Sequence, residues 1–424
     1  WRIDRQPALA ELGAAAAVRF VYGLTSFALM CALAVMLYLA ALRRRDRADL
    51  ADDGDRSHQP LTALPWRGVA VAGSLASLTL VAVALQAFTC PFVLAGGGPR
   101  QTTPVIAMFT VGFQQLTFGP AAAISTLLLA VLAILGILGA LVLIGTGARL
   151  ELDDRCRHAG ARRPGDRVGT LATAGAAVLV VAVIGVAAYA TGPWLAALVD
   201  NSQPPPGSVS LVETFGNTWV PPLISTLLGV GTAAVAGYGI GALRPLGPRS
   251  ELLLLPFAPF LFVGVAPLAL RAYADGATAS RLETMLGLVP PTRLAVPALF
   301  VFTLLARGQA FADQSARRDG VSRSWTRTYI LPTLPMAAIL VVGTWLVSAQ
   351  DLLWPVISGS GDLATGPVRL YDLLGVGGLR GSVPVVLALP WWLLLVIVAA
   401  AVVAQLTYLD RIALRVGDGG ESGT

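Results

Sequence analysis

Closely spaced carboxylates are the residues of this sequence that could carry out acid–base chemistry. Asp52, Asp53 and Asp55 lie in one loop, and Asp153 is followed directly by Asp154. Paired carboxylates at a membrane surface would suit an integral membrane glycosyl-transfer enzyme, which needs a general acid and base. Arginines surround both groups, so a neutralised, solvated loop explains them better.

The residue types that bind metals or phosphate offer little further chemistry. Cys31, Cys90 and Cys156 lie far apart, and His58 and His158 each lie in an arginine-rich loop. This spacing predicts neither a disulfide framework nor a metal site. All 30 basic residues are arginine, whereas a standard phosphate-binding loop requires lysine. We therefore expect no catalytic residue and no cofactor, and any ATP must be bound by a partner subunit.

The composition predicts an all-α, polytopic membrane protein. Hydrophobic residues make up 55% and charged residues 13% of the 424 residues, whereas soluble proteins contain about 25% charged residues. The net charge of +6 does not indicate nucleic acid, because the arginines lie in short loops between apolar runs. About nine runs are long enough to cross a bilayer. They cover residues 19–42, 68–94, 120–146, 169–191, 218–243, 252–270, 294–308, 334–354 and 384–407.

The arginine-rich loops predict the orientation in the membrane. If the loop at 43–67 is cytoplasmic, alternation also places 148–168, 244–250, 307–328 and the tail after residue 408 inside. These segments hold most of the arginines, as the positive-inside rule expects. The C-terminus is therefore predicted to be cytoplasmic. No Asp or Glu lies near the centre of an apolar run, which argues against proton- or sodium-coupled transport.

The longest charged, amphipathic stretch between two apolar runs in the second half of the chain extends from Phe311 to Pro335. Each of its arginines would cost about 2.5–3.5 kcal/mol at the bilayer centre, so the stretch must lie outside the hydrocarbon. Asp319-Gly320 predicts a turn, and Ser322 is a suitable cap for a second short helix that reaches Ile330. We expect a helix-turn-helix on the membrane surface.

This stretch resembles the cytoplasmic coupling loop of permease subunits of binding-protein-dependent ABC importers, especially the carbohydrate-uptake class. In that family the loop begins Glu-Ala-Ala, reaches a glycine, ends in Ile-x-Leu-Pro and docks into a cleft on the ATP-hydrolysing subunit. Here Gln314 replaces the glutamate, and one residue is missing between Ile330 and Pro332. An ordinary loop between helices is the alternative interpretation. The matching residues are Gln314, Ser315, Ala316, Asp319, Gly320, Ile330, Leu331 and Pro332.

Two stretches of the sequence repeat the same order of motifs. One starts at Leu64-Pro65 and the other at Leu331-Pro332. Each continues with an apolar run, a proline at 91 or 355, a glycine-rich segment, and an apolar run that starts at Pro120 or Pro384. We interpret them as parallel copies related by an approximate twofold axis along the membrane normal.

Both copies contain further residues that resemble the family. Phe92–Pro99 is similar to the Leu-Thr-Gly-Gly-Gly-Pro segment of the larger sugar permease subunit, and Gln350–Pro355 to the Asn-Asp-Phe-Leu-Trp-Pro segment of the smaller one. Gln350 and Asp351 are therefore candidates for the substrate path. The first copy has only a degenerate coupling loop, whose matching residues are Asp53, Gly54, Leu64 and Pro65.

The resemblance implies the ABC importer permease fold and a fusion of two permease domains. Residues 1–147 would form an incomplete first domain with three spans, 148–168 a cytoplasmic arginine-rich linker, 169–410 a complete second domain with six spans, and 411–424 a cytoplasmic tail.

The function that the resemblance implies is inward passage of a sugar or sugar-like solute across a bacterial plasma membrane. Its partners would be an ATP-hydrolysing subunit, an extracellular solute-binding protein and membrane lipid, with a second permease chain as a further candidate. A degenerate permease-like scaffold without transport is the alternative, and the glycosyl-transfer enzyme is a weaker one.

Overall fold

The computed structural model describes residues 66–95, 103–152, 178, 185, 210–292, 294–318, 320, 324–359, 361–377, 391–409 and 412–415. These residues are mostly helical, as predicted. Four stretches among them are long and apolar enough to cross a membrane, and they indicate a membrane protein. The total of about nine spans and the permease fold stay predictions. The four stretches are Ala70–Val93, Phe118–Gly145, Leu211–Leu243 and Thr326–Ala349.

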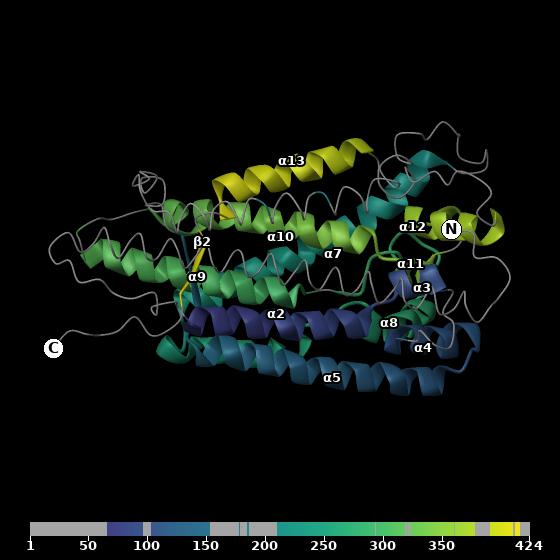
Figure 1. Ribbon diagram of the computed structural model, residues 1–424, viewed down its shortest axis with the longest axis horizontal. Helices are drawn as coiled ribbons and strands as arrows, with labels where there is room; N and C mark the ends of the chain where they lie inside the picture. Colours follow the sequence, from purple (N-terminus) through teal and green to yellow (C-terminus); the bar gives the residue numbers. More distant parts are fainter. Residues whose placement is uncertain are drawn as a thin grey trace.

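The long helices lie side by side along the longest axis of the molecule (Figure 1). They are α2 (Trp66–Gln86), α5 (Phe118–Gly145), α7 (Leu211–Tyr238), α9 (Val296–Arg318), α10 (Leu331–Ala349) and α13 (Trp391–Thr407). Short helices gather at one end, on the right in Figure 1. They are α3 (Thr89–Ala95), α4 (Pro104–Phe109), α8 (Ala266–Thr278), α11 (Leu353–Ser358) and α12 (Gly366–Gly377).

Tighter or wider helical turns join several of these elements. The π-helical turns are η1 (Thr110–Gln114), η3 (Gly239–Leu243) and η5 (Thr326–Ile330), and the 3-10 helices are η4 (Gly247–Phe260) and η6 (Gly361–Leu363). Since η3 continues α7 and η5 leads into α10, two of the four apolar stretches combine α- and π-helical geometry.

The opposite end of the molecule contains a small antiparallel sheet of β1 (Arg149–Leu152) and β2 (Ile412–Arg415), in which Leu150 lies opposite Leu414. Residues 148–152, 244–251, 307–318 and 412–415 meet there, on the left in Figure 1, and we call this region the charged end. Apart from Glu251, these residues belong to four of the segments that the sequence predicts to be cytoplasmic.

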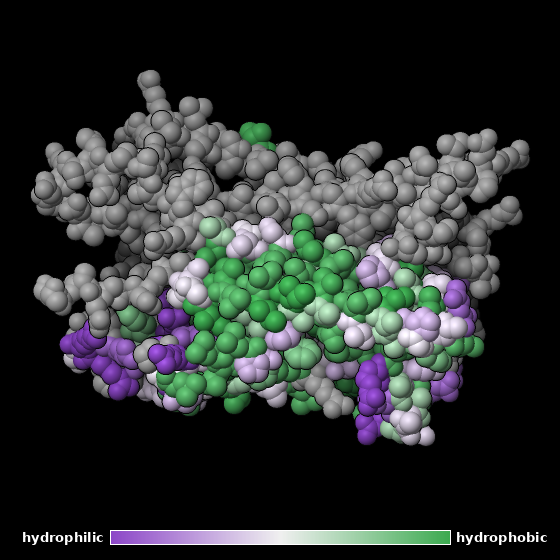
Figure 2. Space-filling view, turned by 90° about the horizontal axis from the view of Figure 1, so that it is seen from below, coloured by the Kyte–Doolittle hydropathy of each residue, from purple (hydrophilic) through white to green (hydrophobic). Residues whose placement is uncertain are grey.

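An apolar belt lies between the two ends. In Figure 2 hydrophobic side chains cover the middle of the visible face, and hydrophilic side chains gather toward its left and right. Large exposed side chains of α5, among them Leu127, Val131 and Ile134, contribute to the apolar surface. An unpartnered apolar belt of this kind is the surface that a membrane protein presents to lipid.

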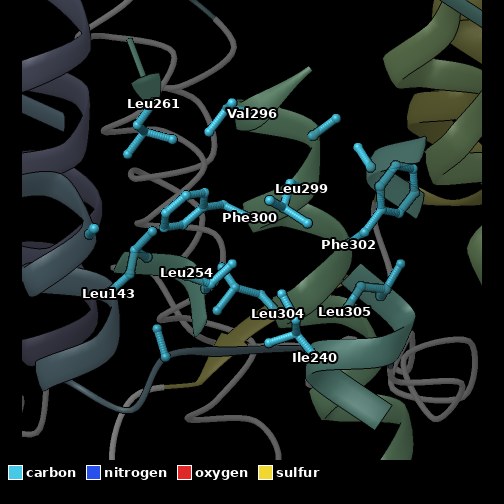
Figure 3. Packing of buried hydrophobic residues seen from close by; sticks show 14 of the residues in the cluster. Leu143, Ile240, Leu254, Leu261, Val296, Leu299, Phe300, Phe302, Leu304 and Leu305 are labelled. Atoms are coloured by element: carbon cyan, nitrogen blue, oxygen red, sulfur yellow. The ribbon is translucent and has the colours of Figure 1, made fainter. Parts of the chain in front are cut away.

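Helix α9 lies at the centre of the largest core cluster. Phe300 and Leu304 lie on the side of Leu143 and Leu254, whereas Phe302 and Leu305 lie on the opposite side of the helix (Figure 3). All of these side chains are buried. Because α9 buries side chains on opposite faces, its position is fixed by α7 on one side and by η4 on the other.

Two glycines allow the backbone of α9 to approach its neighbours closely. A Cβ atom added to Gly237 of α7 would lie 2.6 Å from the Cβ of Phe302. A Cβ atom added to Gly308 would overlap the carbonyl oxygen of Leu150 in β1. No other residue type fits at Gly308 without separating the helix from the strand.

The prolines of two apolar runs have different effects on their helices. The run 252–270 is not one continuous helix, because η4, which contains Pro256 and Pro259, is followed by a break before α8. By contrast, Pro221 and Pro222 are buried inside an unbroken α7. Neighbouring helices cover that site, as membrane helices with internal proline require.

The order of elements in residues 66–152 recurs in residues 331–415. Each series has a long helix, a short proline-containing helix, a medium helical segment, another long helix and a β-strand. Leu150 and Leu414, which pair in the sheet, are separated in sequence by the same distance as Pro91 and Pro355. The strands therefore occupy equivalent positions in the two series.

Candidate coupling surface

The segment that resembles a coupling loop lies between α9 and α10 at the charged end (Figure 1). Helix α9 continues to Arg318, and Gly320 turns the chain with φ +75° while its N–H donates to the carbonyl of Arg317 at 3.1 Å. A positive φ favours glycine. The second helix begins at η5 and runs directly into α10, so it is not the separate surface helix expected from the sequence.

The predicted residues of this segment lie on both arms of the turn. Gln314 and Gly320 are exposed and Ala316 is half-buried. On the second arm Ile330 and Leu331 are 44% and 66% exposed, which leaves two large apolar side chains uncovered beside a charged segment. Pro332 starts α10 and is half-buried. Asp319 and the side chain of Ser315 lie outside the described residues. We call residues 313–318, 320 and 325–332 the coupling surface.

A carboxylate that the sequence analysis overlooked lies at the base of this surface. Asp313 is 7% exposed, and its Oδ2 accepts a hydrogen bond of 2.8 Å from the Nε of Arg317. Its Oδ1 is buried and has no hydrogen-bond partner in the described part of the chain. The four-residue spacing of Asp313 and Arg317 was the signal that could have found this pair. The family has glutamate at the position of Gln314, and Asp313 supplies a carboxylate one residue earlier.

Hydrogen bonds tie the two arms to each other and to α13. Gln309 donates from Nε2 to the Thr333 hydroxyl at 3.1 Å, which joins α9 to α10. The Tyr408 hydroxyl, which follows α13, donates to the carbonyl of Pro332 at 2.8 Å. This bond joins the start of α10 to the residue that directly follows α13.

An aromatic cluster joins the second arm to α7. The indole N–H of Trp325 donates to the Tyr238 hydroxyl at 2.6 Å. The Tyr238 ring also packs edge-on against Tyr329, with ring centroids 5.2 Å apart. Trp325 remains 52% exposed, so it contributes apolar area to the coupling surface while its polar atom is bound. Neither Tyr238 nor Trp325 was predicted as a site residue.

Ion pairs connect the first arm to the rest of the charged end. Glu251 accepts from Arg307 at 3.2 Å and from Arg244 at 3.5 Å. Arg307 also donates to the carbonyl of Ala148 at 3.3 Å, and the guanidinium of Arg149 lies 4.1 Å above the Phe311 ring. A displacement of α9 would therefore be transmitted to β1 and η4.

The candidate residues for the substrate path lie at the far end of α10 from the coupling surface. Asp351 accepts hydrogen bonds of 3.3 Å from the backbone N–H groups of Leu353 and Trp354 and thus caps α11. Burial raises the pKa of the Asp351 carboxyl, although these backbone N–H groups partly oppose the shift. Gln350 is half-buried directly before it. Capping accounts for the contacts of Asp351.

Asp351→Asn is expected to raise the apparent melting temperature at neutral pH by about 2 °C, because it keeps an acceptor for the cap and removes a buried charge. When folding raises the pKa of a carboxyl group, the folded protein becomes more stable as the pH falls through that pKa. The difference between the two proteins should therefore shrink at acidic pH. Melting of both proteins in detergent across this range tests the prediction. A lower melting temperature for Asp351→Asn at neutral pH would contradict it.

The degenerate first coupling loop, with Asp53, Gly54, Leu64 and Pro65, lies outside the described residues. So do the paired carboxylates Asp52–Asp55 and Asp153–Asp154. Within the described residues, no group of three or more His, Cys, Asp or Glu side chains could hold a metal ion.

No protein-family model, curated protein or solved structure matches this chain.

Proposed function

We propose that this protein is the membrane-spanning permease component of an ATP-driven importer, and that the coupling surface binds an ATP-hydrolysing subunit. The observation that carries the proposal is the glycine turn between two antiparallel helices, exposed at the charged end with Ile330, Leu331 and Trp325 uncovered beside arginines. A mixed apolar and cationic surface suits a groove of a partner that is apolar at its base and acidic at its rim.

The connections of α9 support a mechanical function for this surface. Two glycines bring the helix into contact with α7 and β1, and Arg307 joins it to Glu251 and Ala148. A partner that pushes on the turn would therefore move a rigid set of elements. A loop between helices with no partner would not require these contacts.

The two equivalent series of elements also support the permease fold. Antiparallel pairing of β1 with β2, with equivalent leucines directly opposite each other, is the arrangement expected for two copies related by a twofold axis. The sugar class of solute rests on the sequence resemblance, through the Gly-rich segment at 96–98 and the segment that begins at Gln350.

Gly320→Pro is expected to reduce capture of the ATP-hydrolysing subunit at least about tenfold, a change of about 1.4 kcal/mol in binding. Proline fixes φ near −65°, whereas Gly320 requires +75°, so the turn must rearrange. The measurement is co-purification from membranes of the source cells in mild detergent, with the bound ATPase activity as the readout.

Gly361→Pro is the matched control, because Gly361 also has a positive φ, of +57°, with open space around it. It lies at the opposite end of the molecule, so capture should persist. If the native chain captures no ATP-hydrolysing subunit, the importer is ruled out and the permease-like scaffold becomes the better explanation. Equal capture by native chain and Gly320→Pro would place the docking site elsewhere.

A further inference from the structure

The apolar run at 252–270 crosses the helical bundle as a broken helix. The 3-10 helix η4 ends at Phe260 and α8 begins at Ala266, so residues 261–265 belong to neither helix. Such a break exposes backbone N–H and C=O groups that a continuous helix would pair internally. In a membrane it is tolerated only where protein buries it or where it lines a water-filled cavity.

Contacts with α5 place this break near the middle of the membrane. Before the break, the Cβ of Leu261 lies 3.4 Å from the position of a Cβ built on Gly136. After it, the Ser125 hydroxyl donates to the carbonyl of Pro267 at 2.8 Å. Because α5 extends from Phe118 to Gly145, Ser125 and Gly136 lie on either side of its midpoint.

The side chain of Gln86 at the end of α2 holds the break in place. Its Nε2 donates to the carbonyl of Phe262 at 2.7 Å, and its Oε1 accepts from the N–H of Gly264 at 2.7 Å. An unpaired backbone group in hydrocarbon costs several kcal/mol, so these two bonds stabilise a conformation that would otherwise be unfavourable.

The side of Gly264 that lacks a side chain faces the carboxamide of Gln86. A Cβ atom there would meet only the carboxamide of Gln86 within 4 Å, at 3.0 Å from Oε1, among the described residues. Val263 and Gly264 are half-buried rather than fully covered. The break is therefore anchored at Gln86 but not filled by packed side chains at Gly264.

We propose that residues 261–265, positioned by Gln86, line the path of a neutral, hydroxylated solute through the membrane. The proposal rests on the proposed function and specifies where that transport occurs. Discontinuous helices at mid-membrane form the substrate sites of other transporter folds. The groups at this break are a carboxamide, backbone amides and the Ser125 hydroxyl, all uncharged. Such groups exchange hydrogen bonds with hydroxyls and do not require a counter-ion.

The repeated motif order identifies an equivalent residue in the second series. Gln86 and Gln350 are separated in sequence by the same distance as Pro91 and Pro355. Gln86 is the last residue of α2, and Gln350 directly follows α10. The path would therefore contain a glutamine from each series.

Cysteine labelling tests whether the break contacts water. Val263→Cys and Gly264→Cys are made separately after Cys31, Cys90 and Cys156 have been replaced by alanine, and the full chain is placed in lipid nanodiscs. Val263→Cys is nearly isosteric, so it keeps the test valid if Gly264→Cys folds poorly. The probe is a charged methanethiosulfonate reagent that cannot enter hydrocarbon.

Three control positions calibrate the labelling rate. Leu127→Cys lies on the lipid-facing side of α5, Ala258→Cys is buried on η4, and Thr278→Cys is exposed at the end of α8. We expect Val263→Cys and Gly264→Cys to react at least about tenfold faster than Leu127→Cys, because a thiol in apolar surroundings stays protonated and unreactive. Ala258→Cys should stay protected.

Two results would overturn the proposal: labelling at the break as slow as at Leu127→Cys, or equally fast labelling of Ala258→Cys, which would reflect loose packing. Failure here is distinguishable from failure of the proposed function. A protected break together with capture of an ATP-hydrolysing subunit would keep the importer and move the solute path. A water-exposed break without capture would keep the path and remove the ATP-driven importer.

Discussion

Gly308→Ala is expected to destabilise the protein by about 3 kcal/mol, as overpacking of a well-packed interior does. The added methyl group would overlap the carbonyl oxygen of Leu150. That oxygen belongs to the backbone of β1, so it cannot move aside as a flexible side chain could. Either β1 separates from α9, or α9 shifts away from its contacts with α7.

Gly343→Ala is the matched control for this substitution. Gly343 lies inside α10 and has no neighbour within 4 Å of its Cβ position among the described residues. Alanine there should be neutral or stabilising, because glycine in a helix interior is disfavoured by about 1 kcal/mol. Thermal unfolding in detergent and the yield of monodisperse protein measure both variants. Equal stability of the two variants would show that β1 does not pack on α9 as described.

Glu251→Gln is expected to destabilise the charged end by about 2–4 kcal/mol, because removal of one member of a buried ion pair leaves its partners uncompensated. The side chain of Glu251 is 12% exposed and that of Arg307 14%. Arg244 is more exposed, at 31%, so solvent screens it and Arg307 accounts for most of the loss. Glutamine keeps the size of the side chain, so the change reports the charge.

Glu213→Gln provides the control with the same chemical change. Glu213 is exposed in the first turn of α7, where loss of its charge should cost no more than about 1 kcal/mol. Apparent melting temperatures of both variants and of the native chain give the comparison. If Glu251→Gln melts within a degree or so of Glu213→Gln, about the size of a surface effect, the Arg244–Glu251–Arg307 group does not stabilise this end.

The features that the sequence predicts well are those set by composition and by single backbone constraints. Apolar runs predict α5, α7 and α10, because about 20 apolar residues are needed to cross a bilayer. Asp319-Gly320 predicts the turn after α9, since glycine adopts the positive φ observed at Gly320. The alternation of arginine-rich segments predicts that these segments meet at one end of the molecule. The charged end contains residues of four of them.

The features that sequence reasoning missed depend on contacts between distant residues. The strands β1 and β2 are four residues each, too short to give a recognisable alternation. Their pairing is decided by the helices that bring them together. The conformation of the break at 261–265 depends on Gln86, a residue in another helix, and hydropathy gives no sign of that contact. Asp313 was overlooked because the family motif directed attention to Gln314.

The pairing of β1 with β2 has a consequence for biosynthesis. The ribosome completes Leu152 well before Ile412, and at ordinary elongation rates the interval is on the order of tens of seconds. During that time β1 has no partner strand for its pairing edge. Arg149 and Glu151 place charges on the strand, which disfavour pairing with a wrong strand. The last-made strand then closes the sheet, so the nascent chain reaches its final arrangement at this end only after α13 has been synthesised.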